Sequence, residues 1–131
     1  MTDRLDHLLT KEFTNRTEAQ NLNAICEYLS AKGYFWWRQN NTGVQRTKNG
    51  KQFWTRSKWQ RNGVPDVFVM QTGTLIGNGE AKLVYRTIGI EAKSRDGRQS
   101  PEQKAFQRDF EENGGVYILA RGIDDLVKFG I

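Results

Sequence analysis

The sequence contains one cysteine, one histidine and no long apolar run, and each shortage excludes a class of site. Cys26 has no second cysteine to pair with, which excludes a disulfide within the chain. Because Cys26 shares helical spacing with Leu22 and Leu29, we expect it to pack in the core rather than act as a nucleophile. His7 has no histidine or cysteine partner at zinc-ligand spacing, so a zinc site and a Ser-His-Asp triad are both poor hypotheses.

Targeting and membrane-spanning features are also missing from the sequence. Its start, MTDRLDHLLTKEFTNR, lacks the basic region, the apolar stretch and the cleavage site of a signal peptide. No stretch is apolar over the length of a membrane span, and a single cysteine fits a reducing compartment. We therefore expect a cytoplasmic protein that has no membrane partner.

Acidic residues are absent from residues 34–62, although the whole chain contains 15 of them. Seven of the 20 basic residues lie in this basic segment, and so do all four tryptophans. Basic side chains interleaved with aromatic and amide ones suit a phosphate backbone and unstacked bases, so we expect the segment to bind nucleic acid. The alternative is a basic hairpin that only keeps the protein soluble, and we expect any individual tryptophan to lie in the core. The basic residues are Arg38, Arg46, Lys48, Lys51, Arg56, Lys58 and Arg61.

The chain divides into a short N-terminal part and one domain. Residues 1–16 are polar with a short leucine stripe and predict an arm or a short helix, whereas residues 17–131 predict a single domain. Thr17 is a good N-cap, Gln20 stands at the capping-box position and Gly33 provides a stop, so a helix is predicted between them. No repeat or low-complexity tract follows.

Strand-like runs and turn signals alternate along the rest of the chain. Asn49-Gly50 is the best turn of the basic segment. The order of elements predicts an α/β fold, with a mixed central β-sheet flanked by helices. The expected elements are an extended run at 34–40, a short buried strand at 64–70, a glycine-rich turn at 71–80, the longest strand at 81–94, a helix opened by Ser100 and ended by Gly114-Gly115, a buried strand at 116–120 and a short helix at 124–131.

Asp66 and Glu91 stand at opposite ends of two consecutive predicted strands. If these strands pair as an antiparallel hairpin, the two carboxylates converge at one sheet edge, with Lys93 on the same face as Glu91. Adjacent carboxylates repel unless a divalent cation neutralises them, and hard oxygen ligands suit Mg²⁺ or Mn²⁺. The alternative for Glu91 and Lys93 is an exposed ion pair, which contributes ~0–1 kcal/mol.

Two strand motifs, GVPDVFV and IGIEAKS, resemble the signature of the PD-(D/E)xK nuclease superfamily. The stretch RQSPEQKAFQRDFEENGGVYILA further resembles the virus-type replication-repair nuclease (VRR-NUC) branch, in which a Ser-Pro-x-Gln helix and a Gly-Gly turn follow the E-x-K strand. RQNNTG is similar to the R-x-N-x-G stretch of that family, one residue looser. The resemblance covers about residues 17–127. It implies a restriction-endonuclease-like core, metal-dependent phosphodiester hydrolysis and, for compact stand-alone members of phage-like type, resolution of branched DNA such as Holliday junctions.

The same resemblance implies roles for individual residues of the E-x-K region. Asp66 and Glu91 would be metal ligands, with the Ala92 carbonyl completing the share of the protein, and Lys93 would be the catalytic lysine. The implied cofactor is Mg²⁺ or Mn²⁺.

The resemblance implies a catalytic part for Gln103 and for Glu18, and each residue also has a structural alternative. Gln103 matches the helix glutamine of the family, but it also stands at a capping-box position after Ser100. Glu18 matches a helix acid that approaches the metal through water, but a carboxylate there also stabilises a helix N-terminus electrostatically.

These features predict a metal-dependent DNA endonuclease that acts on branched DNA and needs no organic cofactor. Arg38 and Asn40 would contact the DNA together with the other basic residues of the segment. The alternatives are a flap or linear-duplex nuclease of the same superfamily, a non-catalytic nucleic-acid-binding module, and a structural protein in which the motif is accidental. Because one small domain presents one active site, coordinated cutting of two strands predicts a homodimer.

Overall fold

The computed structural model describes residues 16–39 and 44–131. The predicted N-terminal arm, apart from Arg16, and both Asn40 and Gly43 lie outside the described residues. The elements are α2 (Glu18–Lys32), β1 (Phe35–Arg38), β2 (Val44–Lys48), β3 (Lys51–Thr55), β4 (Val67–Gly77), β5 (Glu80–Ala92), α3 (Pro101–Glu112), β6 (Val116–Ala120) and α4 (Ile123–Lys128).

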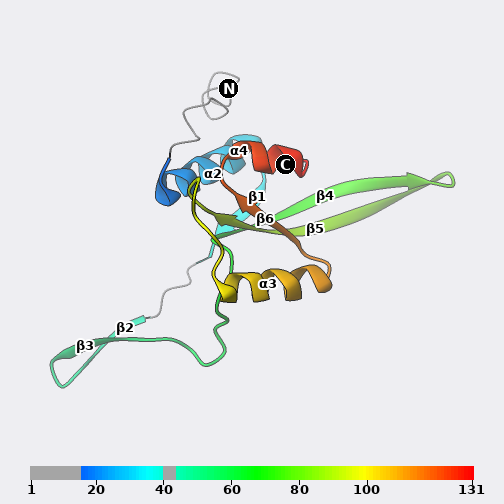
Figure 1. Ribbon diagram of the computed structural model, residues 1–131. Helices are drawn as coiled ribbons and strands as arrows, with labels where there is room; N and C mark the ends of the chain where they lie inside the picture. The colour runs from blue at the N-terminus through cyan, green and yellow to red at the C-terminus, as the bar shows by residue number, and fades with distance from the viewer. Residues whose placement is uncertain (1–15, 40–43) are drawn as a thin grey trace.

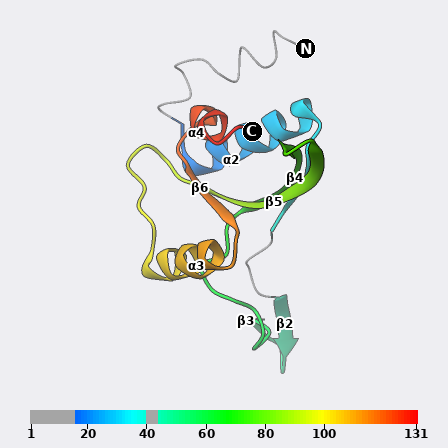
Figure 2. The same cartoon turned by 90° about the vertical axis from the view of Figure 1, so that its right-hand side faces the viewer.

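The central layer is a mixed four-stranded sheet in the order β1-β4-β5-β6. β1, β4 and β5 pair antiparallel, and β6 pairs parallel with β5. Figures 1 and 2 show α2 and α4 on one face of this sheet and α3 on the other. The predicted α/β architecture, a mixed central sheet flanked by helices, is therefore confirmed.

Local signals set the ends of α2 as the sequence predicts. The Thr17 hydroxyl accepts from the Gln20 N–H at 3.2 Å, and Gln20 Oε1 accepts from the Thr17 N–H at 3.0 Å. These two bonds satisfy backbone donors that a helix N-terminus otherwise leaves unpaired. At the other end Gly33 adopts a left-handed conformation with φ of 78°, which a glycine accepts without steric penalty.

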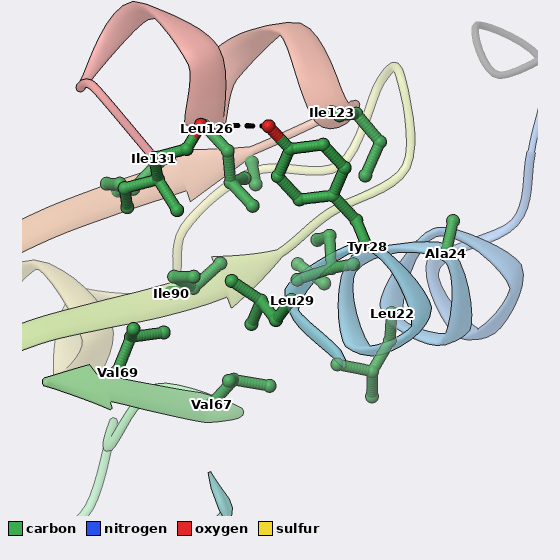
Figure 3. Close-up of a cluster of buried hydrophobic side chains, with 14 of the residues drawn as sticks. Leu22, Ala24, Tyr28, Leu29, Val67, Val69, Ile90, Ile123, Leu126 and Ile131 are labelled. Carbon is green, nitrogen blue, oxygen red and sulfur yellow. Dashed lines mark hydrogen bonds between the residues drawn. The ribbon is translucent and has the colours of Figure 1, made fainter. Parts of the chain in front are cut away.

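The core lies between the sheet and the α2–α4 layer, as Figure 3 shows. Leu29 is fully buried, as are Val69 and Ile90 from the sheet, and burying each such side chain contributes roughly 1.5–3 kcal/mol. The Tyr28 hydroxyl donates to the Ile131 carbonyl at 2.9 Å and thereby attaches the C-terminus to α2. Cys26 packs against this core, and burial raises the pKa of its thiol, which agrees with a packing role.

The chain turns back after β4 later than predicted. The stretch 71–80 does turn the chain back, as predicted, but β4 continues to Gly77 and the turn itself is confined to Asn78 and Gly79, with φ of 51° and 76°. Two consecutive left-handed residues of Asn-Gly type form the hairpin turn that matches strand twist. The register pairs Leu75 with Lys82 and continues as far as Gly77 and Glu80. The outer part of β4 and β5 is therefore a continuous two-stranded ribbon, which extends away from the sheet in Figure 1.

The tryptophans differ from the expectation that each lies in the core. Trp54 and Trp59 are 65% and 84% exposed and Trp37 is 39% exposed, whereas Trp36 is partly buried against the core. Trp54 is exposed because it lies in β3, which forms with β2 a separate two-stranded sheet that is not hydrogen-bonded to the central one. Its turn is at Asn49-Gly50, which confirms the predicted hairpin.

Within the described parts of the chain, no helix is long and apolar enough to cross a membrane.

Candidate metal centre

Asp66 and Glu91 meet at the open end of the β4–β5 hairpin. Val67, which follows Asp66, pairs with Ile90, which precedes Glu91. Asp66 Oδ2 accepts a hydrogen bond from the Ala92 N–H at 2.9 Å, which holds the aspartate across the strand end. The antiparallel pairing on which the predicted convergence depends is therefore confirmed.

A third carboxylate reaches the same point from α2. Glu18 is the first residue of that helix, and one oxygen from each of Glu18, Asp66 and Glu91 lies within 4.8 Å of the others. Three carboxylate oxygens at this separation can share one divalent cation, because metal–oxygen distances of about 2.0–2.6 Å place ligands that far apart.

Glu91 is the most constrained of the three acids. Its side chain is buried, with 2% exposed, and its Oε2 has no hydrogen-bond partner among the described residues. Burial, followed by the negative charge of Asp66, raises the pKa of Glu91 to about 8. An ionised carboxylate buried without a donor is costly, so this oxygen favours either a proton or a cation as its neighbour.

Gln103 caps α3, which is the structural alternative, and also contacts Glu91, whereas its catalytic part stays a prediction. Its Oε1 accepts from the Ser100 N–H at 2.9 Å while the Ser100 hydroxyl accepts from the Gln103 N–H at 3.1 Å, which completes the capping box of α3. The same side chain donates from Nε2 to Glu91 Oε1 at 2.9 Å. The cap of α3 therefore also orients the buried glutamate.

Lys93 follows directly after β5 with 12% of its side chain exposed. Its Nζ lies 3.9 Å from Glu18 Oε1, and its backbone N–H donates to the Ala120 carbonyl at 3.0 Å. An exposed ion pair between Glu91 and Lys93 is excluded, because Glu91 is buried. The ammonium instead stands beside the acid cluster.

Asn21 holds the backbone of Lys93, and the sequence reasoning missed it. Its Nδ2 donates to the Lys93 carbonyl at 2.9 Å and to the Ala120 carbonyl at 2.8 Å, and the residue is 1% exposed. The available signal was an amide on the apolar face of a helix, one turn after Glu18, because a buried amide must find backbone partners.

Ala92 contributes its backbone to this end of the sheet. Its N–H bonds Asp66 and its side chain is fully buried in the core. The use of its carbonyl as a metal ligand stays a prediction.

A pocket of about 410 Å³ opens beside the carboxylates. Arg56 lines it from the basic segment and donates to Asn62 Oδ1 at 2.8 Å. Gly63 has φ of 76°, and a Cβ there would lie 2.2 Å from the Glu102 carbonyl oxygen. Only glycine allows this wall of the pocket to approach the first turn of α3 so closely. The lining residues are Arg56, Asn62, Gly63, Val64, Asp66, Glu91, Ser100, Glu102 and Gln103.

The remaining basic residues are exposed but differ in their surroundings. Arg61 forms an ion pair with Asp109 and lies over the Phe106 ring, so its charge already has a partner. Lys58 Nζ lies 5.1 Å from the centre of the Trp59 ring. The structure therefore brings Arg56 to the acids and leaves the hairpin residues further from them (Figure 1). The hairpin residues are Arg46, Lys48 and Lys51, and Arg38 is exposed on β1.

Arg121 supports the loop that follows Lys93 and was not identified from the sequence. Its guanidinium donates to the Ser94 carbonyl at 3.1 Å and to the Gly97 carbonyl at 2.5 Å. This contact connects the loop to the end of β6.

No family model matches the sequence, and neither a curated protein nor a solved structure matches it. The function is therefore argued from the acids, the lysine and the basic surface themselves.

Proposed function

We propose that this chain is a metal-dependent DNA endonuclease with a restriction-endonuclease-like PD-(D/E)xK core of the VRR-NUC type. The observation that carries the proposal is the buried, unpartnered Oε2 of Glu91, within a cluster of three carboxylates whose oxygens lie within 4.8 Å of one another. A cluster of this kind, placed at a strand end beside a largely buried lysine, is suited to phosphodiester hydrolysis.

The donor chemistry fits Mg²⁺ or Mn²⁺. All three candidate side chains, those of Glu18, Asp66 and Glu91, are carboxylates, and no histidine or cysteine is among them. Hard oxygen donors of this type select hard divalent cations over zinc or copper. When bound, such a cation neutralises the acids, accepts phosphate oxygens and lowers the pKa of water.

Lys93 would act on the phosphate or on the attacking water. Its ammonium is 12% exposed and 3.9 Å from Glu18, so it is held at the edge of the cluster. A fixed positive charge there stabilises negative charge that develops on a phosphate during attack by water. Asn21 and Gln103 would position Lys93 and Glu91 respectively, since each bonds its partner directly.

The basic segment would hold the DNA. Its hairpin exposes basic side chains together with Trp54, and Arg56 reaches the pocket next to the carboxylates. Phosphate neutralisation by such residues gives binding that weakens steeply with salt. Branched DNA, such as a four-way junction, is the proposed substrate.

The test incubates labelled four-way junction, flap and linear duplex with Mg²⁺, Mn²⁺ or chelator. Cleavage should require the metal and should be fastest on the junction, whereas faster cleavage of flap or duplex would reassign the substrate. Asp66→Asn and Glu91→Gln should abolish both cleavage and the thermal stabilisation that Mg²⁺ provides. Salt-sensitive binding without any cleavage in the wild-type protein would instead indicate a non-catalytic binding module.

A further inference from the structure

The outer part of the β4–β5 hairpin has two open edges. β1 covers β4 only as far as Met70, and β6 covers β5 only from Ile88 onwards. Residues 71–87, here called the arm, therefore pair only with each other among the described residues. A two-stranded ribbon is at best marginally stable alone in water, and open edges are templates for pairing with another chain.

The arm has one face without any charge. Residues directly opposite in the register share a face, and successive residues alternate between faces. Ile76 is 82% exposed, Leu83 is 60% exposed and Tyr85 is 63% exposed on this uncharged face. The uncharged face is made of Thr72, Thr74, Ile76, Ala81, Leu83, Tyr85 and Thr87, whereas the opposite face carries Gln71, Gly73, Leu75, Gly77, Glu80, Lys82, Val84 and Arg86.

The uncharged face continues onto the main sheet. Met70 and Phe35 pair across β4 and β1 on this side and are 42% and 68% exposed. Trp37, two residues along β1 from Phe35, stacks on Phe68 with ring centres 5.6 Å apart, and Phe68 meets Phe110 of α3. An aromatic row therefore connects the α3 side of the core to the arm.

The opposite face anchors the base of the arm. Gln71 Nε2 donates to the Gly130 carbonyl at 2.9 Å, and the Arg86 guanidinium donates to the Phe129 carbonyl at 2.6 Å. Arg86 Nε also donates to Gln71 Oε1 at 2.9 Å. These contacts hold the base of the ribbon in one orientation, so the uncharged face is presented at a defined angle.

We propose that the uncharged face of the arm is the surface on which a second copy of this chain docks, with its own arm, about a two-fold axis. Nucleic acid does not suit this face, because phosphates require positive charge and none is present. A second copy suits it, because a contact between two uncharged faces adds no local repulsion between chains that each have a net charge of +5. A two-fold contact places the same face against itself, so each residue of the uncharged face meets uncharged residues of the second copy.

This inference stands apart from the proposed function, because it is tested without metal or DNA. If both hold, the dimer supplies the two active sites that coordinated cutting of a branched substrate requires.

The test measures the mass of the full-length protein by sedimentation equilibrium. We expect twice the chain mass of 15.1 kDa. Ile76→Glu buries an unpaired carboxylate in the contact, so it should raise the dimer dissociation constant at least ~100-fold and give the mass of one chain. Leu75→Glu is the matched control, because Leu75 is the neighbouring residue, is 63% exposed and lies on the opposite face, and it should stay dimeric.

Several results would overturn the inference. A monomeric wild-type protein would do so, including one in which another part of the same chain covers the face. Equal dissociation by Ile76→Glu and Leu75→Glu would show that the face is irrelevant, and an Ile76→Glu protein that stays dimeric would place the contact elsewhere. Leu83→Glu provides a second substitution on the same face, and a cooperative thermal transition above the assay temperature in either variant distinguishes dissociation from unfolding.

Discussion

The two hairpins of this protein have the same type of turn but expose different kinds of side chain. Both turn through Asn-Gly pairs in the left-handed conformation, at residues 49–50 and 78–79. The β2–β3 hairpin exposes basic side chains and Trp54, whereas the β4–β5 arm has an uncharged face with Ile76 and Leu83. Identical turns therefore serve different surfaces, for which we propose different partners, nucleic acid for one and protein for the other. The candidate metal centre lies at the root of the second hairpin.

The largest effect is expected at the root of the β4–β5 hairpin, where the proposed catalytic residues lie. Lys93→Ala should reduce metal-dependent cleavage by roughly 10²–10³-fold, because a fixed charge beside the developing negative charge is lost. Binding of the uncut junction should be unchanged. Single-turnover cleavage and gel-shift titration measure the two quantities.

Lys128→Ala is the control for that substitution. Its Nζ lies 3.9 Å from an Asp125 oxygen, the same separation as in the Lys93–Glu18 pair, but its side chain is 74% exposed and lies in α4. Normal cutting by Lys93→Ala, or an equal loss in Lys128→Ala, would remove the lysine from the proposed site.

The next effect sharpens the assignment of DNA binding to the β2–β3 hairpin. Replacing both Lys48 and Lys51 by alanine should weaken DNA binding about tenfold at moderate salt and reduce the salt slope by about 2, since two phosphate contacts are lost. Lys82→Ala, in the arm, should leave both quantities unchanged. Fluorescence anisotropy over a salt series measures them, and an equal effect of Lys82→Ala would erase the difference between the hairpins.

Three glycines test whether substitution destabilises the protein more in the wall of the pocket than in either hairpin turn. Gly50, Gly63 and Gly79 have nearly equal φ values of 75°, 76° and 76°, but only Gly63 has neighbours that an added Cβ would strike. Gly63→Ala should therefore destabilise the protein by roughly 2–4 kcal/mol, against about 1 kcal/mol for each turn glycine. Urea denaturation measures the difference. Equal losses at all three positions would mean that the wall moves aside freely.

The last effect concerns pH and the root of the β4–β5 hairpin. Because burial in the folded protein raises the pKa of Glu91 from its ordinary value of 4.5 to about 8, the folded state holds a proton that the unfolded state releases. Stability of the metal-free protein should fall as pH rises from 4.5 to 8. Added Mg²⁺ should reverse the loss at the upper end, and Glu91→Gln should flatten the profile. Tm measured against pH, with and without Mg²⁺, checks this, and an unchanged slope in Glu91→Gln would assign the dependence to another group.

Much of the fold follows from signals that act within a few residues. Thr17 and Ser100 each begin a helix with a complete capping box, and Gly33 ends one, because these bonds involve neighbours in sequence. The mixed sheet also follows from the order of apolar runs. The length of β4 does not, because glycine content alone suggested a turn, whereas pairing with β5 keeps Gly73 extended.

The candidate site also contains some residues that the sequence predicted and others that it did not. Asp66, Glu91 and Lys93 could be chosen from the sequence, because strand alternation and antiparallel pairing predict where such residues meet. Asn21 and Gly63 could not, because their roles depend on partners 72 and 39 residues away along the chain. The amide on the apolar face of a helix indicates that Asn21 needs a partner, but not which one.

The sequence by itself determined the kinds of side chain available, the helix caps, the Asn49-Gly50 turn and the pair of strands that carries the acids. Only the tertiary structure decided that Glu91 is buried with an unpartnered oxygen, that Gln103 both caps and orients, and that one face of the arm is left uncovered. The physical reason is range: caps and turns are satisfied by atoms a few residues away, whereas burial depends on which distant layers pack together.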